Sequence, residues 1–421
     1  MRRACLAVIV SFVFAPRAAW PQGGIPQGPE FRVNSYTTNV QDRPAAVADP
    51  AGNFVVIWDG QGQGDSNLGI FGQRYAGSGT PLGSEFRVNT ATTNFESSAS
   101  VAADSSGNFV VVWSSSGGYG GTPPDVFGQR FASDGTPLGL EFRINSFTTG
   151  GQFNPAVAAA SAGGFVVVWT GDGQGDSSGI FGQRYASSGL PLGPEFRVNT
   201  STTDFQYLPS VAADSTGNFV VAWTSGGGYG GAPSDVFGQR YASSGTPLGP
   251  EFLVNTYTTN TQGNPAVAGG SAGGFVVLWS GAGQGDTFGI FGQRYASSGA
   301  PAGPEFRANS STTDFQFAPS VAADAAGSFV VAWTVSGGYG GVPADVVGQR
   351  YASDGTPLGA DFRINTYTTS GQSSAAVAAD PVTGNFVVTW VSIGQDGSNT
   401  GIFGQRYGRI VPVELTGFSL E

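Results

Sequence analysis

The side chains that could do chemistry in this sequence are of few kinds. The chain has no His, all 18 basic residues are Arg, and the single Cys is Cys5. These absences exclude His or Cys metal sites, Ser-His-Asp and Cys-His nucleophiles, Schiff-base and P-loop lysines, and disulfides. Any binding or catalysis must therefore use Asp, Glu, Arg, Tyr, Ser or Thr.

Three tyrosines, Tyr119, Tyr229 and Tyr339, each lie in a Gly-Gly-Tyr-Gly-Gly segment. A Tyr flanked by four glycines has little local packing, and its rigid ring with a polar end suits stacking on sugars or on a partner surface. Tyr207, in an adjoining loop with Phe205, could extend such a surface. The alternative is that each Tyr folds back over its own repeat.

Aspartates occupy Gly-Gln-Gly-Asp-like segments that alternate with the tyrosine segments. The candidate ligand-binding residues here are Asp65, Asp176, Asp286 and Asp396. Calcium is the metal to consider, because only oxygen ligands are available. Asp172 and Asp176 are the tentative calcium ligands, and no other cofactor is expected. The alternative is that these aspartates form ordinary Asx turns.

The elements that carry these residues belong to an internal repeat of about 54 residues. Trp58, Trp113, Trp169, Trp223, Trp279, Trp333 and Trp390 mark seven units at spacings of 54 to 57. The second unit contains four strand signals, at Ser100–Ala103, Asn108–Trp113, Val126–Phe131 and Glu141–Asn145. With 68 Gly and 25 Pro the chain is not a helical bundle. We predict an all-β, seven-bladed β-propeller of four-stranded antiparallel blades over residues 30–407.

The phase of the repeat predicts how the ring closes. The first unit opens with Glu30–Asn34 and the last ends with Gly404–Tyr407, so the N-terminal strand should complete the seventh blade as its outermost strand. This closure resembles that of WD-repeat propellers, although the Gly-His and Trp-Asp signatures are absent. The repeat looks like the tandem propeller repeats of secreted bacterial proteins. Because such proteins differ in function, the resemblance implies little about activity.

The two ends of the chain indicate export. Residues 1–24 read as a signal peptide, with Arg2 and Arg3 before the apolar run Ala4–Ala15 and a cleavage site between residues 15 and 24. Residues 408–421 leave the repeat, and their Pro-Val-Glu-Leu segment resembles the start of C-terminal sorting or anchoring regions in some secreted bacterial proteins. We expect a secreted or cell-surface monomer whose mature chain does not span the membrane. The net charge of −11 argues against a nucleic-acid partner.

Repeated residues also have structural explanations. The seven Trp side chains should pack between blades. The Arg of each Gly-Gln-Arg segment should pair across strands with the Glu of the following strand, as in Arg184 with Glu195.

A few residues depart from the repeat: Asp42, Arg43, Asp59, Glu96, Asp172 and Leu253. Asp59 and Asp172 could face each other across the mouth of the ring, but the Ser-x-Asp-x-Gly-x-Thr-Trp box of sialidases is missing. We therefore predict a non-catalytic propeller that binds glycans or surface polymers through its long-loop face. The alternative is a structural or protein–protein interaction module that binds an extracellular protein. A glycosidase-like enzyme is the third reading.

Overall fold

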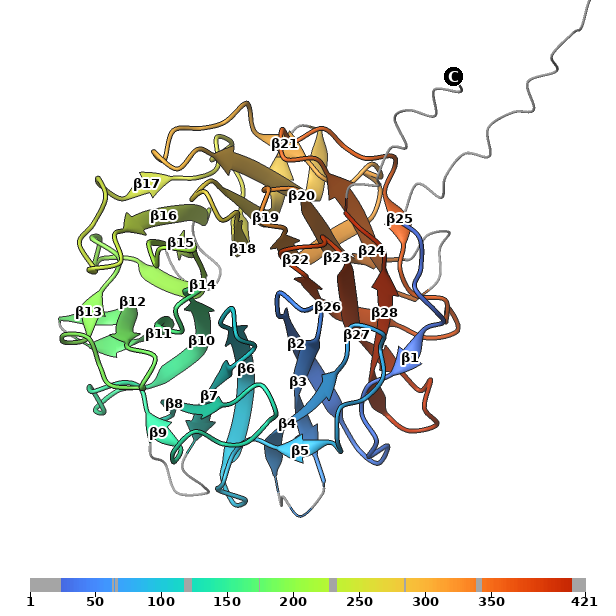
Figure 1. The fold of residues 1–421 in the computed structure, drawn as a ribbon. Helices are drawn as coiled ribbons and strands as arrows, with labels where there is room; N and C mark the ends of the chain where they lie inside the picture. The colour runs from blue at the N-terminus through green and yellow to red at the C-terminus, as the bar shows by residue number, and fades with distance from the viewer. Residues whose placement is uncertain are drawn as a thin grey trace, which may run out of the picture.

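The chain folds into a ring of seven small sheets around a central channel (Figure 1). The computed structural model describes residues 24–62, 64, 67–116, 123–173, 175–226, 233–283, 285–337 and 343–410. Each sheet has four antiparallel strands, in the order β2-β3-β4-β5 for the first blade. The predicted all-β, seven-bladed propeller is confirmed.

The first strand of every blade lines the channel, where its small Ala-Val-Ala side chains suit the crowded axis. These inner strands are β2 (Gln41–Ala48), β6 (Phe95–Ala103), β10 (Gln152–Ala159), β14 (Phe205–Ala213), β18 (Gln262–Gly269), β22 (Phe315–Ala323) and β26 (Gln372–Ala379). The second strands are β3 (Phe54–Gln61), β7 (Phe109–Ser116), β11 (Phe165–Gly173), β15 (Phe219–Gly226), β19 (Phe275–Gly283), β23 (Phe329–Ser336) and β27 (Phe386–Ile393).

The two remaining positions lie toward the rim. The third strands are β4 (Leu68–Tyr75), β8 (Asp125–Phe131), β12 (Asp176–Tyr185), β16 (Asp235–Tyr241), β20 (Asp286–Tyr295), β24 (Asp345–Tyr351) and β28 (Thr400–Tyr407). The outer strands are β5 (Phe86–Arg87), β9 (Phe142–Arg143), β13 (Phe196–Arg197), β17 (Phe252–Leu253), β21 (Phe306–Arg307), β25 (Phe362–Arg363) and β1 (Phe31–Arg32). At two residues each, the outer strands are shorter than the five-residue segment predicted from Glu141–Asn145.

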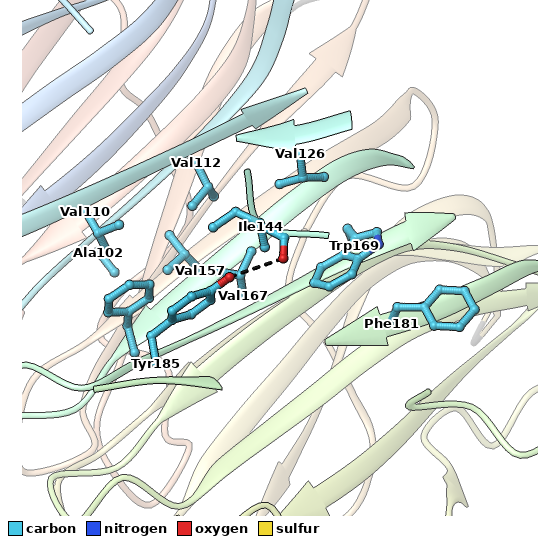
Figure 2. Close-up of a cluster of buried hydrophobic side chains, with 11 residues drawn as sticks. Ala102, Val110, Val112, Val126, Ile144, Val157, Val167, Trp169, Phe181 and Tyr185 are labelled. Atoms are coloured by element: carbon cyan, nitrogen blue, oxygen red, sulfur yellow. Dashed lines mark hydrogen bonds between the residues drawn. The ribbon is translucent and has the colours of Figure 1, made fainter. Parts of the chain in front are cut away.

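The core lies between the blades. Both faces of each second strand are covered by sheet, so Phe165–Trp169 of β11 is buried without alternation. Figure 2 shows one such cluster, in which Val110 and Val112 of blade 2 pack against Val167, Trp169 and Tyr185 of blade 3. The Tyr185 hydroxyl donates to the carbonyl oxygen of Ile144, the residue that follows the outer strand of blade 2, at 3.2 Å.

Each Trp is buried as predicted, and the fold adds a hydrogen bond that the sequence did not suggest. In six blades the indole Nε1 donates to the side-chain oxygen of the first buried glutamine of the inner strand, as Trp58 does to Gln41 at 2.9 Å and Trp169 to Gln152 at 2.8 Å. Blade 2 is the exception, because Glu96 stands at the glutamine position. There no described residue accepts a hydrogen bond from Trp113.

The ring closes in the predicted way. Strand β1 pairs with β28, which places the N-terminal strand at the outer edge of blade 7. The carboxylate of Glu30 accepts hydrogen bonds from the Thr366 backbone and hydroxyl, which fastens the first segment to the outer loop of blade 6.

Two faces result from the alternation of strand direction. The long-loop face carries the loops between second and third strands and those that lead into the inner strands. The short-turn face carries the Asp-x-x-Gly turns and the loops between third and outer strands. The described part of the chain contains no helix with the length and apolarity needed to cross a bilayer.

Candidate functional site

Near the long-loop face, every inner strand has a bulge that brings one residue to positive φ. These bulge residues are Arg43, Ser98, Asn154, Leu208, Asn264, Ala318 and Ser374, with φ between 49° and 58°. None is glycine, so the left-handed conformation has a cost that the surrounding structure must offset. Six of the seven side chains are uncharged. Arg43 is the exception.

In five blades the residue that follows the Trp accepts a hydrogen bond from the bulge N–H of the next blade. In blade 3 the hydroxyl of Thr170 accepts a hydrogen bond from the bulge N–H of Leu208 in blade 4, at 3.2 Å. Blades 2, 4 and 6 use a Ser or Thr in the same way. A small hydroxyl is thus sufficient for this structural task.

Blade 1 has a carboxylate at this position. Asp59 Oδ2 accepts a hydrogen bond from the bulge N–H of Ser98 at 3.0 Å, and its Oδ1 has no hydrogen-bond partner among the described residues. The nearest cation is Arg43, whose Nη1 lies 3.5 Å from Asp59 Oδ2. The Asp59 side chain is 1% exposed and that of Arg43 is 55% exposed. Arg43 therefore stands between the buried carboxyl and solvent.

Burial dominates the electrostatics of Asp59. It raises the pKa of this carboxyl from its ordinary 3.8 to about 7, although the Ser98 N–H and the Arg43 guanidinium both lower it. The neighbouring negative charge of Asp42 adds a smaller upward push. A carboxyl with a pKa near 7 can be protonated or ionised at neutral pH, which is what general acid–base catalysis requires.

Two further carboxylates belong to the same boundary between blades 1 and 2. Asp42 is directly opposite Asp59 in the β2–β3 register, so the two side chains project from one face of the sheet. Glu96, in β6, lies opposite Ser115 and accepts a hydrogen bond from its hydroxyl at 3.1 Å. Strand alternation places Asp59 on the face of Ile57, and Glu96 on the face of Trp113. Ile57 and Trp113 meet in one core cluster between these blades.

Four of the six departures from the repeat thus meet at one blade boundary, beside the channel. The sequence singled out Asp42, Arg43, Asp59 and Glu96 as irregular, but it gave no reason to combine them. Asp172 lies in blade 3 and Leu253 in the outer strand β17, so neither belongs to this group. We refer to Asp42, Arg43, Asp59 and Glu96 as the blade 1–2 site.

Several predicted ligand-binding residues cannot be placed. Tyr119, Tyr229, Tyr339 and Asp65 lie outside the described residues. Tyr207 is described: it lies half-buried on β14, opposite Thr224 and next to the bulge residue Leu208.

The described loop aspartates have inward-facing structural contacts. Asp176 and Asp286 are buried, and each accepts a 2.7 Å hydrogen bond from the amide of an outer-strand asparagine, Asn199 and Asn309 respectively. Asp396 contacts Asn34 similarly at 3.5 Å. In even blades Asp125, Asp235 and Asp345 make the same contact. The repeat therefore explains these carboxylates without a ligand.

Calcium remains a prediction. Asp172 is half-buried and its backbone oxygen accepts a hydrogen bond from Gln152, while both carboxylate oxygens of Asp176 accept hydrogen bonds from protein groups. Within the described ranges, no group of three or more acidic, His or Cys residues could hold a metal ion.

The predicted Arg–Glu pairs are replaced by contacts between blades. Arg184 donates to the carbonyl oxygens of Leu192 in its own blade and of Ser243 in the next blade. Glu195 instead accepts hydrogen bonds from the backbone and hydroxyl of Ser146 in the preceding blade. Both side chains extend across the blade boundary, which the sequence register within one hairpin could not reveal.

Clefts open between blades on the short-turn face. Three have volumes of about 330, 360 and 380 Å³, between blades 4 and 5, 7 and 1, and 1 and 2. Each contains the repeated Arg and turn Asp side chains. Because the Arg side chains are engaged by carbonyl oxygens there, these clefts follow from the scaffold and carry no chemistry that distinguishes one blade from another.

Comparisons with known proteins support the fold. No protein-family model matches the sequence, and a search of curated proteins finds no match. Among solved structures, a protein of unknown function from Dyadobacter fermentans has a TM-score of 0.54 at 12% identity, covering 76% of this chain and 96% of its own. An α-L-arabinanase from Penicillium chrysogenum, complexed with arabinobiose, has a TM-score of 0.51 at 13% identity, covering 90% and 99%. A Hadza microbial sialidase has a TM-score of 0.48 at 10% identity, covering 81% and 73%.

The arabinanase overturns the predicted function. We predicted a non-catalytic protein that binds glycans or surface polymers, because the sequence contains no recognisable catalytic motif. A similar fold occurs in an arabinanase, so the fold gives no ground for excluding catalysis. The expectation was wrong because it required a recognisable sequence motif, whereas the acidic residues of blades 1 and 2 come together only through strand register.

Proposed function

We propose that this protein is a glycoside hydrolase-like enzyme whose reaction takes place at the blade 1–2 site. The observation that carries the proposal is Asp59, a buried carboxyl with a pKa near 7 at a position where a hydroxyl is sufficient for the fold. A charged group that the scaffold does not need, and that lowers stability, suits a functional role. The solved arabinanase supports a glycan as the substrate class.

Arg43, Asp59 and Asp42 each have a role in the proposed reaction. Arg43 meets the substrate first because it is half-exposed beside the channel, and its 3.5 Å contacts with Asp59 and the Ser98 hydroxyl hold it loosely. When Arg43 turns to the substrate, its contact with Oδ2 is released and the Asp59 carboxyl becomes accessible. Protonated Asp59 then gives its proton to the glycosidic oxygen as the C–O bond breaks.

Asp42 supplies the second carboxylate of this proposal. It lies opposite Asp59, is half-buried, and accepts a 2.8 Å hydrogen bond from the Arg43 backbone N–H. As the carboxylate it either takes a proton from the attacking water or attacks the anomeric carbon itself, which gives inversion or retention of configuration respectively. Water provides the hydroxyl of the new sugar end, and the proton from Asp59 leaves with the departing sugar.

The test is release of reducing sugars from a polysaccharide panel that includes arabinan. We expect wild-type protein to release sugar from at least one substrate, and Asp59→Asn and Asp42→Asn each to lower kcat at least about 100-fold, since each removes one proton-transfer or nucleophilic group. Asp134→Asn, on the short-turn face, is the matched control and should keep full activity. Absence of turnover on every substrate, or full activity in Asp59→Asn, would refute the proposal.

A further inference from the structure

Exposed apolar side chains are segregated by type between the two faces. The exposed aromatic residues among those described are Phe95, Phe147, Phe153, Phe205, Tyr257 and Phe315, at 37% to 60% exposure, and all lie at the long-loop end of their strands or in the loops before them. The loops on the short-turn side expose leucines instead, including Leu140 and Leu190. Ile393, at the long-loop end of β27, is an exposed aliphatic exception. The exposed aromatic rings are therefore concentrated on the long-loop face.

The rings follow the two-blade repeat. In blades 2, 4 and 6 the exposed ring is the first residue of the inner strand: Phe95, Phe205 and Phe315. In blades 3 and 5 it lies instead in the loop that leads to the inner strand, where Phe147 and Tyr257 each lie against a glycine, Gly173 and Gly283. A side chain on either glycine would contact the aromatic residue. Phe153 is a second exposed ring in blade 3, at the start of the inner strand. Apart from it, adjacent blades place their rings at two alternating positions around the channel.

Some of these rings are held by local contacts. The Phe315 ring lies 5.9 Å from that of Phe288, inclined at 56°. Phe153 packs over Gly151, where a Cβ would lie 2.4 Å from the ring. An exposed ring that is already fixed loses little conformational entropy when a ligand covers it.

The polar groups beside the rings indicate the ligand chemistry. Asn94, Asp204 and Asp314 immediately precede the rings of blades 2, 4 and 6. A ring face matches the C–H face of a sugar, while an adjacent amide or carboxylate oxygen can accept hydrogen bonds from sugar hydroxyls. Two of the three neighbours are acidic and the chain carries a net charge of −11, so an anionic polymer would be repelled.

We propose that these six aromatic residues form a collar that binds a neutral polysaccharide chain and leads it to the blade 1–2 site. The part of this inference that leads the polysaccharide to the blade 1–2 site rests on the proposed function. Polysaccharide binding by the collar can be tested without turnover. Rings in blades 2 to 6 can contact several sugars of a polymer at once, and a disaccharide would occupy few of them. The collar therefore favours long chains over short ones.

Affinity electrophoresis in gels that contain polysaccharide tests the collar directly. We expect neutral arabinan, xylan or galactan to retard the wild-type protein, and polygalacturonate not to do so. Phe95→Ala, Phe205→Ala and Phe315→Ala should each weaken binding about threefold to tenfold. Phe205→Tyr should retain binding. Phe205→Leu should weaken binding as much as Phe205→Ala does, because Leu keeps apolar area without an aromatic face.

The matched control removes leucines from the other face. A Leu140→Ala, Leu190→Ala double variant should be retarded like the wild type. Unchanged retardation after loss of all three phenylalanines, retention by Phe205→Leu, or no retardation of the wild type by any neutral polysaccharide would overturn the collar. If the collar variants lose binding but the wild type releases no sugar, the collar stands and the proposed hydrolysis fails.

Discussion

At the scale of single residues, Asp59 shows how a repeat can be altered at one position without changing its fold. Blades 2, 3, 4 and 6 use a hydroxyl to accept the bulge N–H of the next blade, and Asp59 Oδ2 accepts the same bond in blade 1. The second oxygen, Oδ1, is what the carboxyl adds, and it is buried without a partner among the described residues. Such an atom has a desolvation cost that the hydroxyl in other blades does not have.

This cost predicts a pH-dependent gain in stability for Asp59→Thr. In the unfolded chain the carboxyl loses its proton near 3.8, whereas the folded protein keeps it to about 7. Between these values the folded state binds the additional proton, so wild-type stability falls as pH rises, by about 1.4 kcal/mol per unit for one proton. Thr cannot titrate. The free energy of unfolding of Asp59→Thr, relative to that of the wild type, should therefore increase from pH 4 to pH 7 and then remain level.

Denaturant unfolding of the two proteins between pH 4 and pH 8 measures this difference. Thr170→Ser, the corresponding position in blade 3, is the control and should show no pH-dependent difference from the wild type. A constant difference for Asp59→Thr across this range would mean that Asp59 titrates normally.

At the scale of elements, each blade is tied to the next by side chains that cross the boundary. The Arg of the third strand donates to carbonyl oxygens of the following blade, and the acidic residue that precedes the outer strand accepts bonds from the preceding one. Both residues were predicted to be structural, but the predicted partners were wrong. Pairing within a hairpin can be predicted from the sequence, whereas contacts between blades depend on how the sheets pack.

Arg184→Ala should therefore lower the free energy of unfolding by about 1–2 kcal/mol, because it removes bonds to Leu192 and Ser243 that are partly exposed to solvent. Arg363→Ala is the control, since Arg363 is exposed on β25. Chemical denaturation midpoints measure both effects. Equal stability of wild type and Arg184→Ala would show that the Arg184 hydrogen bonds between blades make no measurable contribution to the free energy of unfolding.

At the scale of the whole molecule, the ring was predictable because one pattern is repeated seven times. Strand number, the inner position of the Ala-Val-Ala strand and closure by Glu30–Asn34 all follow from the repeat and its phase. The candidate site was predictable only in part. Asp42, Arg43, Asp59 and Glu96 were visible as departures, but the β2 bulge that sets Asp42 opposite Asp59 has no clear signal in the sequence.

The central claim is that the proton of Asp59 drives glycan hydrolysis at the blade 1–2 site, and the pH dependence of turnover tests it most directly. On a polysaccharide that the wild type cleaves, kcat/KM measured from pH 5 to pH 9 should fall above about pH 7, as Asp59 loses its proton. Asp59→Thr should be inactive at every pH while remaining folded. Full activity in Asp59→Thr, or wild-type activity that does not fall above pH 7, would contradict the account.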